Sequence, residues 1–557
     1  MLSPRPTSVD AVAVAEVARV VGAPLAEGPG NVHDVQVSGV SLDSRTVRPG
    51  DLYAALPGRR EHGADHAAQA VAAGAAVLLT DPAGLARLGH HPEDLDPVPV
   101  LVVPDPRAVL GAAAALVYGD AAHGLTLVGI TGTNGKTTTA YLLESGLRAL
   151  GEPTGLIGTV ETRIGDTRVK SVRTTPEAPD LHALFAVMRE QGVATVVMEV
   201  SSHALAQHRV DGAVFDVALF TNLSQDHLDF HETMEGYFAA KAALFTPEHA
   251  RRGVVCVDDP WGVRLAAESG VPVVTVGSRL GVRADWVVEH HGDGPRFALV
   301  GPTGHLTLQC HLPGEFNVVN TAMAAVALLE LGHSPDQVQR AMETEPLVPG
   351  RMEVVTATDP DPGRDPRCIV DYAHTPDAVE AALRALRPTT PGRLVVVLGA
   401  GGDRDRGKRA AMGAAAAEWA DHVIVTDDNP RSEDPAAIRA EVRAGAAEGL
   451  ARSVDGSGGG GTSRLRGRPS LRGRMVAPGQ ALGGSSQVTD EGSRRRAIGA
   501  AVTWARKGRP ASDNTVLVLG KGHETGQEIA GVVHAFDDRD ALRAALDGLV
   551  YRPEATQ

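Results

Sequence analysis

The stretch Leu125–Leu150, LTLVGITGTNGKTTTAYLLESGLRAL, decides the fold of this 557-residue chain. Its first six residues are mostly aliphatic and predict a buried strand, and its last twelve carry helix formers with apolar residues at helical spacing. Gly132-Thr133-Asn134-Gly135-Lys136-Thr137 lies between the two segments. A strand, a glycine-rich turn with a lysine and a helix together predict a phosphate-binding loop, because glycines let backbone N–H groups approach an anion and the helix N-terminus is partly positive.

In such a loop the lysine, here Lys136, meets the terminal phosphates, and the Thr137 hydroxyl is a first ligand for Mg²⁺. The common pattern places about four residues between its first glycine and the Gly-Lys pair. Gly129 leaves five residues there and Gly132 leaves two, so this loop is a variant. A glycine-rich chain can produce such a pattern by chance, but the strand before it and the helix after it favour a phosphate site.

Composition and charge narrow the class of protein. A chain of this length that is 43% hydrophobic and 22% charged indicates a globular protein of about three or four domains. The net charge of −15 argues against general nucleic-acid binding. The three cysteines lie far apart and imply no disulfide framework, which fits a reducing cytosol. Without a signal-peptide pattern or an apolar run of about 18 residues, we expect a cytoplasmic protein that inserts in no membrane.

Residues 123–349 alternate between aliphatic runs and helical segments, which predicts a mostly parallel, doubly wound sheet. The predicted strands are Val193–Val200, Val214–Thr221, Val254–Val257 and Val271–Val276. Ligands of such sheets bind at the carboxyl ends of the strands. Polar clusters follow two of these runs, at Glu199–His203 and at Thr221–His227. We therefore expect both clusters beside the phosphate loop.

Residues 350–557 repeat the alternation and predict a second sheet of nucleotide-binding type with its own cleft. The predicted strands are Cys368–Tyr372, Arg393–Leu398, His422–Thr426 and Thr515–Leu519, each followed by polar residues. Between Ser453 and Ser493 the pattern breaks into four consecutive glycines and RLRGRPSLRGR. With almost no apolar residues to bury, this segment predicts a disordered insertion, whose arginines either contact an acidic partner or remain solvated.

Individual side chains allow more than one interpretation. Glu199 closes an aliphatic strand, where it either binds Mg²⁺ or caps a helix. The Asp226–His231 cluster contains imidazole and carboxylate, which coordinate divalent ions, although no CxxC or HExxH pattern supports zinc. Lys241 lies in YFAAKAALF, where a snorkelling surface lysine is the ordinary interpretation. The Ser44-Arg45 turn and the Gly58–Asp65 loop either hold a phosphorylated ligand or are ordinary loops.

Taken together, the motifs resemble those of the Mur ligases of bacterial peptidoglycan synthesis, and most closely the members that use meso-diaminopimelate. The resemblance runs along nearly the whole chain, in family order: LDSR, GDLYAALPG, GTNGKTT, TTPE, EVSSHALAQHRV, TNLSQDHLDFH, YFAAKAALF, GEFNVVN, VPGRMEVV, VDYAHTPDAVE, GAGGDRDRGKR, DNPR and GKGHE. Each motif alone is weak, whereas the ordered set is specific. The resemblance implies an ATP-dependent amide ligase that adds meso-diaminopimelate to UDP-N-acetylmuramoyl-L-alanyl-D-glutamate through an acyl phosphate.

We therefore expect an α/β fold of three domains. The first is a small N-terminal α/β domain, residues 1–122, for which the resemblance implies binding of the UDP-linked substrate. The second is a central P-loop ATPase-like domain with a mostly parallel sheet, residues 123–349. The third is a C-terminal Rossmann-like α/β domain, residues 350–557, for which the resemblance implies binding of the amino acid. The expected insertion, residues 453–493, lies in the third domain.

The resemblance also implies the site residues. Those implied for catalysis are Lys136, Glu199, His227 and Lys241, and those for Mg²⁺ are Thr137, Glu199, His227 and Lys241 as its carbamate. Those implied for ATP are Gly132, Thr133, Asn134, Gly135, Lys136, Thr137, Thr138, Asn317, Asn320, Arg351 and Asp371. Those implied for the UDP-linked substrate are Leu42, Ser44, the Gly58–Glu61 loop, Thr174, Thr175, Ser201, Gln207 and Arg209. Those implied for diaminopimelate are Arg404, Asp428, Asn429, Pro430, Arg431, Gly520 and Glu524. Arg173 departs from the family pattern, since some relatives have Asn before the Thr-Thr pair.

The implied cofactors are ATP and Mg²⁺, and the implied partners are the two substrates, with no nucleic acid; we expect a monomer. A folylpolyglutamate synthetase is a rival, because it shares the ATPase domain and the chemistry, but LDSR and DNPR argue against it. A catalytically inactive ATP-binding regulator is a rival of another class. The joint presence of Lys136, Thr137, Glu199, His227 and Lys241 argues against that rival.

Overall fold

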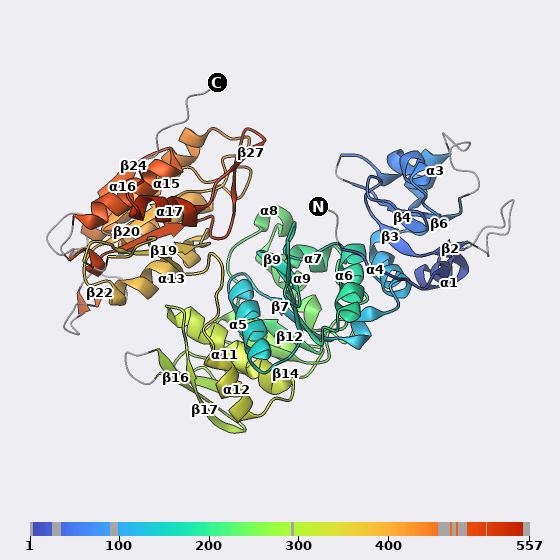
Figure 1. Cartoon of the computed structure of the whole chain (residues 1–557), viewed down its shortest axis with the longest axis horizontal. Coiled ribbons are helices and arrows are strands. Elements are labelled where there is room, and N and C mark those ends of the chain that lie inside the picture. The colour runs from blue at the N-terminus through green and yellow to red at the C-terminus, as the bar shows by residue number, and fades with distance from the viewer. Residues whose placement is uncertain are drawn as a thin grey trace. The chain divides into compact units, whose positions relative to one another are not determined.

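The computed structural model describes residues 4–24, 35–58, 60–89, 98–290, 295–361, 363–454, 468–469, 475–476, 487–507 and 510–549. The chain folds into two compact units of helices packed on sheets (Figure 1). The first unit comprises Met1–Leu223, Glu235–Gln309 and Val319–Thr344, and the second comprises Ser224–Met234, Cys310–Val318 and Glu345–Gln557. The predicted boundaries at 122/123 and 349/350 stay a prediction.

The smaller sheet of the first unit is parallel throughout, in the order β3 (Gly39–Ser41), β4 (Asp51–Ala55), β5 (Val77–Thr80) and β6 (Val100–Val102). The helices of this part are α1 (Val14–Val21), α2 (Ala67–Ala72), α3 (Pro82–Leu88) and α4 (Pro106–Val117). The strands on either side of α1, β1 (Val12–Ala13) and β2 (Gln36–Val37), form a short antiparallel pair. Asp-Pro pairs begin both α3 and α4, because the aspartate side chain accepts backbone N–H groups of the first turn while proline fits the first helical position.

The larger sheet of the first unit has the order β10-β9-β8-β11-β7-β12-β13-β14-β15-β16-β17. Its strands are β7 (Thr126–Thr131), β8 (Thr154–Ile157), β9 (Glu161–Ile164), β10 (Thr167–Lys170), β11 (Thr195–Glu199), β12 (Val217–Phe220), β13 (Gly253–Cys256), β14 (Val273–Gly277), β15 (Trp286–His290), β16 (Arg296–Gly301) and β17 (Gly304–Gln309). The strands from β8 to β15 in this order pair in parallel, and antiparallel strands extend both edges. The expected mostly parallel sheet is confirmed.

Strand β7 lies in the middle of this sheet, between β11 and β12. Parallel pairing aligns Glu199 of β11 with Ile130, and Phe220 of β12 with Thr131. The three strands are therefore level at their carboxyl ends. The loops that follow them leave the sheet at one edge, as the polar clusters after the aliphatic runs predicted.

The helices that lie wholly or largely in the first unit are α5 (Lys136–Ala149), α6 (Ala178–Glu190), α7 (Ser202–Ala206), α9 (Met234–Ala242), α10 (Pro260–Glu268), α11 (Glu315–Glu330) and α12 (Pro335–Met342). Helix α5 follows the phosphate loop directly and contacts β7, β8 and β11. The predicted strand and helix on either side of the loop are both present.

The second unit contains a six-stranded sheet in the order β18 (Glu353–Val355), β19 (Arg367–Asp371), β25 (Thr515–Leu519), β20 (Leu394–Leu398), β21 (His422–Val425) and β24 (Gln487–Asp490). All pairs are parallel except that of the edge strand β18. Its longer helices are α13 (Pro376–Leu386), α14 (Lys408–Trp419), α15 (Pro435–Val454), α16 (Arg494–Arg506) and α17 (Asp538–Leu546). The short helix α8 (Leu228–His231) and the hairpin β26 (Gly526–Ile529)–β27 (Val532–Ala535) also belong to this unit.

Successive residues of these strands point into different cores, which is why the strands read as continuous aliphatic runs. Leu394, Val396 and Leu398 pack in the core beneath α13, α14 and α15. Val395 and Val397 pack in the core beneath α16 and α17. A sheet covered by helices on both faces has the doubly wound architecture that was expected.

The interpretation of residues 453–493 as a disordered insertion is wrong at its C-terminal end. Gln487–Asp490 forms β24 and pairs in parallel with β21. Only one side chain of this edge strand is half-buried, so its sequence lacks the aliphatic run that marked the other strands. Residues 491–493 connect β24 to α16. Apart from these, α15's last turn and the paired two-residue strands β22 (Arg468–Pro469) and β23 (Met475–Val476), the remainder of the segment lies outside the described residues.

Among the described residues, no helix combines the length and the hydropathy that crossing a membrane requires.

A fully buried ion pair joins two helices beneath the carboxyl end of β25. Arg494 of α16 donates through Nε and Nη2 to the Asp538 carboxylate at 2.7 Å, and both side chains are 0% exposed. Arg494 Nη2 also donates to the carbonyl of Leu519, the last residue of β25, at 2.8 Å. The pair therefore fixes the point at which the chain leaves β25.

Arg494→Met should destabilise the second unit by about 3–5 kcal/mol, because it leaves Asp538 as a buried charge without its partner. Native-state hydrogen exchange of the β25 amides measures this change as a loss of protection. Arg496→Met is the matched control on the same helix, since Arg496 is 72% exposed and pairs with Glu491 at the surface. That change should cost about 1 kcal/mol or less. Equal losses in both variants would contradict a structural role for the buried pair.

Candidate active site

The phosphate loop, Gly132–Gly135, joins β7 to α5 in a conformation that requires glycine. Gly132 has φ +146° and Gly135 has φ +88°, in the region that side chains disfavour. A Cβ added at Gly135 would lie 2.5 Å from Oδ1 of Asn320. Thr138, in the first turn of α5, is buried. Helix α5 thus begins at a loop whose backbone lies close to its neighbours and whose N–H groups can face an anion.

The end of β12 holds this loop from the side. Asn222 accepts the Asn134 N–H through Oδ1 at 2.9 Å and donates through Nδ2 to the Asn134 carbonyl at 3.0 Å. The Thr221 hydroxyl donates to the same carbonyl at 2.6 Å, and the Thr133 N–H donates to the Asn222 carbonyl at 2.9 Å. The polar cluster after β12 therefore shapes the phosphate loop.

Two lysines converge on one carbonyl oxygen of the loop. Lys136 Nζ and Lys241 Nζ each donate to the Gly132 carbonyl at 2.8 Å, and Lys136 also donates to the Thr133 carbonyl. Lys241 is 1% exposed and lies over the ring of Tyr237, 4.5 Å from its centroid. The interpretation of Lys241 as a snorkelling surface lysine is therefore wrong.

Glu199 closes β11 and is 1% exposed beside the first turn of α5. Its Oε2 accepts the Thr137 hydroxyl at 2.9 Å, and its Oε1 accepts the Thr159 N–H at 2.8 Å. It does not cap the next helix, because Ser201 is the N-cap of α7. A carboxylate and a hydroxyl in contact are oxygen donors of the kind that Mg²⁺ prefers, so these residues fit that ion.

The backbone of Glu199 connects this group to residues predicted for the UDP-linked substrate. The Thr175 hydroxyl donates to the Glu199 carbonyl at 2.8 Å and accepts the Ser201 N–H at 3.1 Å. The Thr174 hydroxyl lies 3.0 Å from that of Thr159. Three of the predicted residues therefore lie against β11.

The other two predicted residues of this group form a charged cluster around Glu177 of the TTPE motif. Arg209 donates to the Thr175 carbonyl at 3.3 Å and to Gln207 Oε1 at 2.6 Å, and its Nε lies 3.1 Å from Glu177. Arg107 and Arg173 also pair with Glu177. Burial lowers the pKa of the Arg209 guanidinium, partly offset by the Glu177 charge. Three guanidinium groups around one carboxylate leave an excess of positive charge that suits an anionic substrate.

The N-terminal residues predicted for this substrate lie in the smaller sheet's part of the first unit. Ser44 is buried and its hydroxyl donates to Gln69 Oε1 at 2.8 Å, while Leu42 is half-buried beside it in sequence. The Gly58 N–H donates to the Glu61 carbonyl, which closes the predicted loop.

Three residues predicted for ATP belong to the second unit. Asp371 ends β19 and accepts the backbone N–H groups of Met352 and Ala373, each at 2.8 Å. Burial raises the pKa of the Asp371 carboxyl, against the opposing effects of the Arg351 charge and these hydrogen bonds. Arg351 stacks over the Tyr372 ring, 4.3 Å from its centroid. Asn317 is buried and donates to the Pro313 carbonyl.

The residues predicted for diaminopimelate also meet in the second unit, around a lysine that the sequence analysis did not single out. Lys521 is 0% exposed, and its Nζ donates to Asn429 Oδ1 at 3.1 Å and to Glu524 Oε2 at 3.2 Å. Asp428 Oδ1 lies 3.6 Å from the same ammonium. Asn429 Nδ2 donates to Glu524 Oε2 at 2.9 Å. A Cβ added at Gly520 would lie 2.6 Å from Asp428 Oδ2, so this position requires glycine.

The DNPR loop, residues 428–431, places its arginine next to the loop after β20. Arg431 Nη1 donates to the Gly402 carbonyl at 2.6 Å, and Pro430 precedes it in the same turn. Arg404 is exposed on the Gly402 loop. The predicted residues from three strand ends, those of β20, β21 and β25, therefore gather at one edge of the second sheet.

His227, predicted for Mg²⁺, lies in the second unit with a φ of +55°. Its Nε2 lies 3.6 Å from Asp226 Oδ2, and the same carboxylate faces His374 at 3.9 Å and Lys408 at 3.8 Å. Burial alone would raise the pKa of Asp226, but these three charges outweigh it and lower that pKa. Within the described part of the chain, no group of three or more His, Cys, Asp or Glu side chains is arranged to hold a metal ion.

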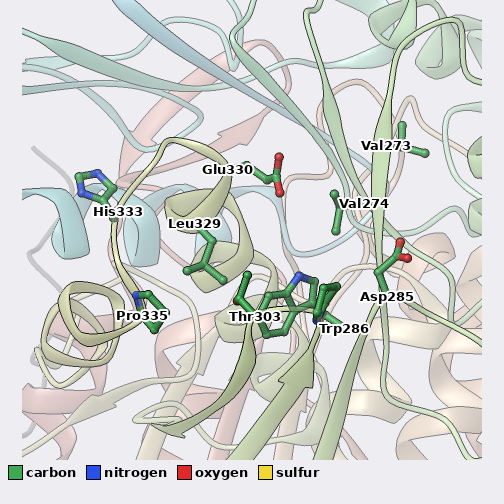
Figure 2. Close-up of a pocket in the computed structure, with 10 residues that line it drawn as sticks. Val273, Val274, Asp285, Trp286, Thr303, Leu329, Glu330, His333 and Pro335 are labelled. Carbon is green, nitrogen blue, oxygen red and sulfur yellow. The ribbon is translucent and has the colours of Figure 1, made fainter.

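A separate cavity of about 320 Å³ lies in the first unit (Figure 2). Its charged lining groups have partners: Asp285 accepts from Thr275, Glu330 pairs with Arg252, and His333 pairs with Glu152. None of the predicted site residues lines it. The strand ends therefore remain the candidate active site, and this cavity does not.

Comparisons with known proteins identify the family of the chain. Residues 36–118 match the profile described as Mur ligase family, catalytic domain, residues 130–328 match the Mur ligase middle domain, and residues 350–456 match the Mur ligase, glutamate ligase domain. The UDP-N-acetylmuramoyl-L-alanyl-D-glutamate–2,6-diaminopimelate ligase of Streptomyces avermitilis is 50% identical over 547 residues, which cover 98% of each chain. The chain belongs to the Mur ligase family.

Solved structures share its fold. A structure of a UDP-N-acetylmuramoyl-L-alanyl-D-glutamate–2,6-diaminopimelate ligase matches with a TM-score of 0.62 and 28% identity, and covers 97% of this chain and 99% of that one. The Mycobacterium tuberculosis folylpolyglutamate synthase complexed with ADP matches with a TM-score of 0.57 and 18% identity, covering 75% and 93%. The latter likeness shows the fold alone, and it leaves a quarter of this chain unmatched.

Several residues at these sites were missed by the sequence analysis. They are Thr159, Glu177, Tyr237 and Lys521. Glu177, Tyr237 and Lys521 lie inside motifs that were quoted, close to predicted residues, so proximity in sequence was the available signal. Thr159 follows β8, where only the folded sheet brings it to Glu199.

Gly135→Ala should weaken binding of ATP at least tenfold, about 1.4 kcal/mol, because the new methyl group meets Asn320 and forces the loop to move. Titration with a fluorescent ATP analogue measures this affinity. Gly151→Ala is the matched control at the other end of α5, since Gly151 has φ +83° and a Cβ there meets nothing within 4 Å. Gly151→Ala introduces a similar backbone strain without a steric contact. A similar loss of ATP affinity in both variants would therefore show that contact with Asn320 does not cause the loss.

Proposed function

We propose that this protein is an ATP-dependent ligase that joins meso-diaminopimelate to UDP-N-acetylmuramoyl-L-alanyl-D-glutamate, forming an amide bond for peptidoglycan synthesis. The name of the relative from Streptomyces avermitilis supports this choice of substrates, over nearly the full length of both chains. We also propose three domains, residues 1–122 for the UDP-linked substrate, 123–349 for ATP and 350–557 for the amino acid.

The position of Glu199 carries the proposal. Its carboxylate accepts the hydroxyl of Thr137, at the start of the helix behind the phosphate loop, and its carbonyl accepts the hydroxyl of Thr175. One residue therefore contacts both the group suited to a nucleotide's phosphates and the group suited to the acceptor substrate. A phosphoryl donor and acceptor bound there would be neighbours, as direct transfer requires.

The reaction needs this transfer because a carboxylate is a poor acyl donor. The γ-carboxylate oxygen of the D-glutamate residue attacks the γ-phosphorus of ATP, which releases ADP and forms an acyl phosphate. The amine of diaminopimelate then attacks the acyl carbon, and the tetrahedral intermediate expels phosphate and leaves the amide. Since the bonds change at the substrates, the chain contributes position and charge.

The residues of the first unit have separate tasks in this scheme. The backbone N–H groups at the start of α5 and the ammonium of Lys136 neutralise the phosphates. Arg209 and Ser201 bind the anionic dipeptide. Thr137, Glu199 and a carbamate on Lys241 would hold Mg²⁺, which supplies charge neutralisation on the transferred phosphoryl group when bound.

The residues of the second unit select the amino acid. Asp428 and Glu524 suit an ammonium group, while the guanidinium of Arg431 suits a carboxylate, which it can grip with two charge-assisted hydrogen bonds. Meso-diaminopimelate carries both groups at its distal carbon, whereas L-lysine carries only the ammonium. Arg431 therefore distinguishes the two amino acids.

Phosphate release with all three substrates tests the proposed function. Release should require ATP, the UDP-linked dipeptide and diaminopimelate together. Replacing the dipeptide and diaminopimelate with a folate and glutamate should give none. Release with the folate pair would favour the folylpolyglutamate synthetase, and no release in either mixture would favour an inactive ATP-binding regulator.

Lys241→Ala should lose nearly all activity, and so should Lys241→Arg, which keeps a positive charge but cannot form the carbamate. The reason is that Lys241 and Lys136 share the Gly132 carbonyl, so an anionic carbamate in place of one ammonium removes a repulsion and adds an oxygen ligand. Formate should partly restore the alanine variant. Phosphate release with and without formate measures this, with Lys507→Ala, an exposed lysine, as control. Full activity in Lys241→Ala would rule out the carbamate.

Arg431→Ala should lose most of the kcat/KM for diaminopimelate while gaining little with lysine. The wild type should prefer diaminopimelate by a factor on the order of 10⁴, because lysine has no distal carboxylate for the Arg431 guanidinium to bind. Steady-state kinetics with both amino acids measure this, with Arg443→Ala, half-exposed on α15, as control. An unchanged preference in Arg431→Ala would show that another residue makes the selection.

A further inference from the structure

The hairpin β26–β27 is hydrogen-bonded along the DNPR loop. Gln527 Nε2 donates to the Asp428 carbonyl at 2.7 Å, and the Glu528 N–H donates to Asn429 Oδ1 at 2.9 Å. The Arg431 N–H donates to the Glu528 carbonyl at 3.0 Å, and the Ala530 N–H donates to the Arg431 carbonyl at 2.7 Å. These four bonds fix the hairpin's first strand to the loop that carries Arg431.

Glu528 is held at both of its backbone groups by this arrangement, since its N–H and its carbonyl each bond to the DNPR loop. Its side chain is thereby kept beside Arg431, with Oε2 3.4 Å from Arg431 Nε. Arg431 itself has a φ of +52°, a conformation that non-glycine residues rarely adopt and that the bonds to the hairpin hold. The pairing of the two side chains follows from the fixed backbones of both.

The Arg431 guanidinium consequently has two acceptors within the second unit. Nη1 donates to the Gly402 carbonyl at 2.6 Å, and Nε faces the Glu528 carboxylate. Neither contact uses the third nitrogen, Nη2. The side chains are 23% and 39% exposed, and an ion pair this close to solvent contributes little and exchanges readily.

We propose that Glu528 is a specificity-determining residue that acts through Arg431, as an internal carboxylate that occupies the guanidinium until the distal carboxylate of the amino-acid substrate replaces it. This inference rests on the proposed function, because it takes Arg431 to be the group that recognises that carboxylate. Glu528 is a positioning residue and not a catalytic one, since it touches no reacting atom.

The exchange has opposite consequences for the two amino acids. Diaminopimelate must compete with Glu528 for Arg431, so the internal carboxylate raises the KM for diaminopimelate. With lysine bound, Glu528 still pairs with Arg431 and spares it from remaining without an anion. Glu528 therefore reduces the preference for diaminopimelate over lysine that Arg431 alone would give. It also keeps the Arg431 guanidinium paired whichever amino acid is bound.

The test is steady-state kinetics of Glu528→Gln with diaminopimelate and with lysine. Glutamine keeps the size and the backbone contacts but removes the competing charge. The KM for diaminopimelate should fall roughly two- to fivefold, the range of an exposed ion pair, with kcat unchanged. The ratio of kcat/KM for diaminopimelate to that for lysine should rise. In the Arg431→Ala background, Glu528→Gln should change neither value.

Asp540→Asn is the control for the loss of one negative charge, because Asp540 is 75% exposed on α17 and pairs with Arg543 at the surface. A KM for diaminopimelate that rises in Glu528→Gln would overturn the inference, since Glu528 would then bind the substrate's ammonium. An unchanged KM, or an effect that persists without Arg431, would also overturn it. If the wild type is active with diaminopimelate, the proposed function stands and these outcomes test the role of Glu528 alone. If the wild type is inactive with diaminopimelate, the proposed function and the role of Glu528 are both overturned.

Discussion

The level carboxyl ends of β11, β7 and β12 are the constraint on which the first site depends. The register pairs Glu199 with Ile130 and Phe220 with Thr131, so one strand delivers the phosphate loop and its neighbours deliver Glu199 and Asn222 beside it. Because side chains alternate along a strand, a shift of one residue in the pairing of β11 with β7 would turn the Glu199 carboxylate to the opposite face of the sheet. Both faces are buried, which makes such a shift costly and the site geometry a consequence of the core.

The two sites present charged groups opposite in sign to the groups they are proposed to bind. In the first unit, Lys136 donates to the Gly132 carbonyl, and its positive charge suits phosphates. In the second unit, Asp428 and Glu524 share the single ammonium of Lys521, an excess of negative charge that suits an ammonium. In both cases the charged groups are largely buried, where low dielectric strengthens their interaction with a bound ligand.

A feature could be predicted from the sequence where it leaves a pattern in neighbouring residues, and could not where it depends on tertiary contacts. Buried parallel strands are aliphatic runs in the sequence, so the fold class and the strands β11, β12, β20 and β25 could be predicted. The phosphate loop could be located from its glycines and Lys136. Edge strands have no such requirement, and β24 was therefore taken for part of an insertion. Tertiary contacts leave no local signal at all: Thr159 reaches Glu199 across 40 positions of sequence, and Lys521 looks like an ordinary surface lysine until burial is known.

The proposed amino-acid site also leaves one polar atom without a hydrogen bond, and this bears on how it would bind a ligand. Asp428 Oδ1 is buried without a hydrogen-bond partner among the described residues, since the Lys521 ammonium lies 3.6 Å away, beyond hydrogen-bond distance. A buried acceptor of this kind costs about 1–3 kcal/mol. An ammonium bound between Asp428 and Glu524 would supply the missing donor and recover that cost, whereas a neutral group of the same shape would not. The buried Asp428 carboxylate of the proposed site would thus favour a cationic amino acid over a neutral one, because the cation supplies both a hydrogen-bond donor and an opposite charge.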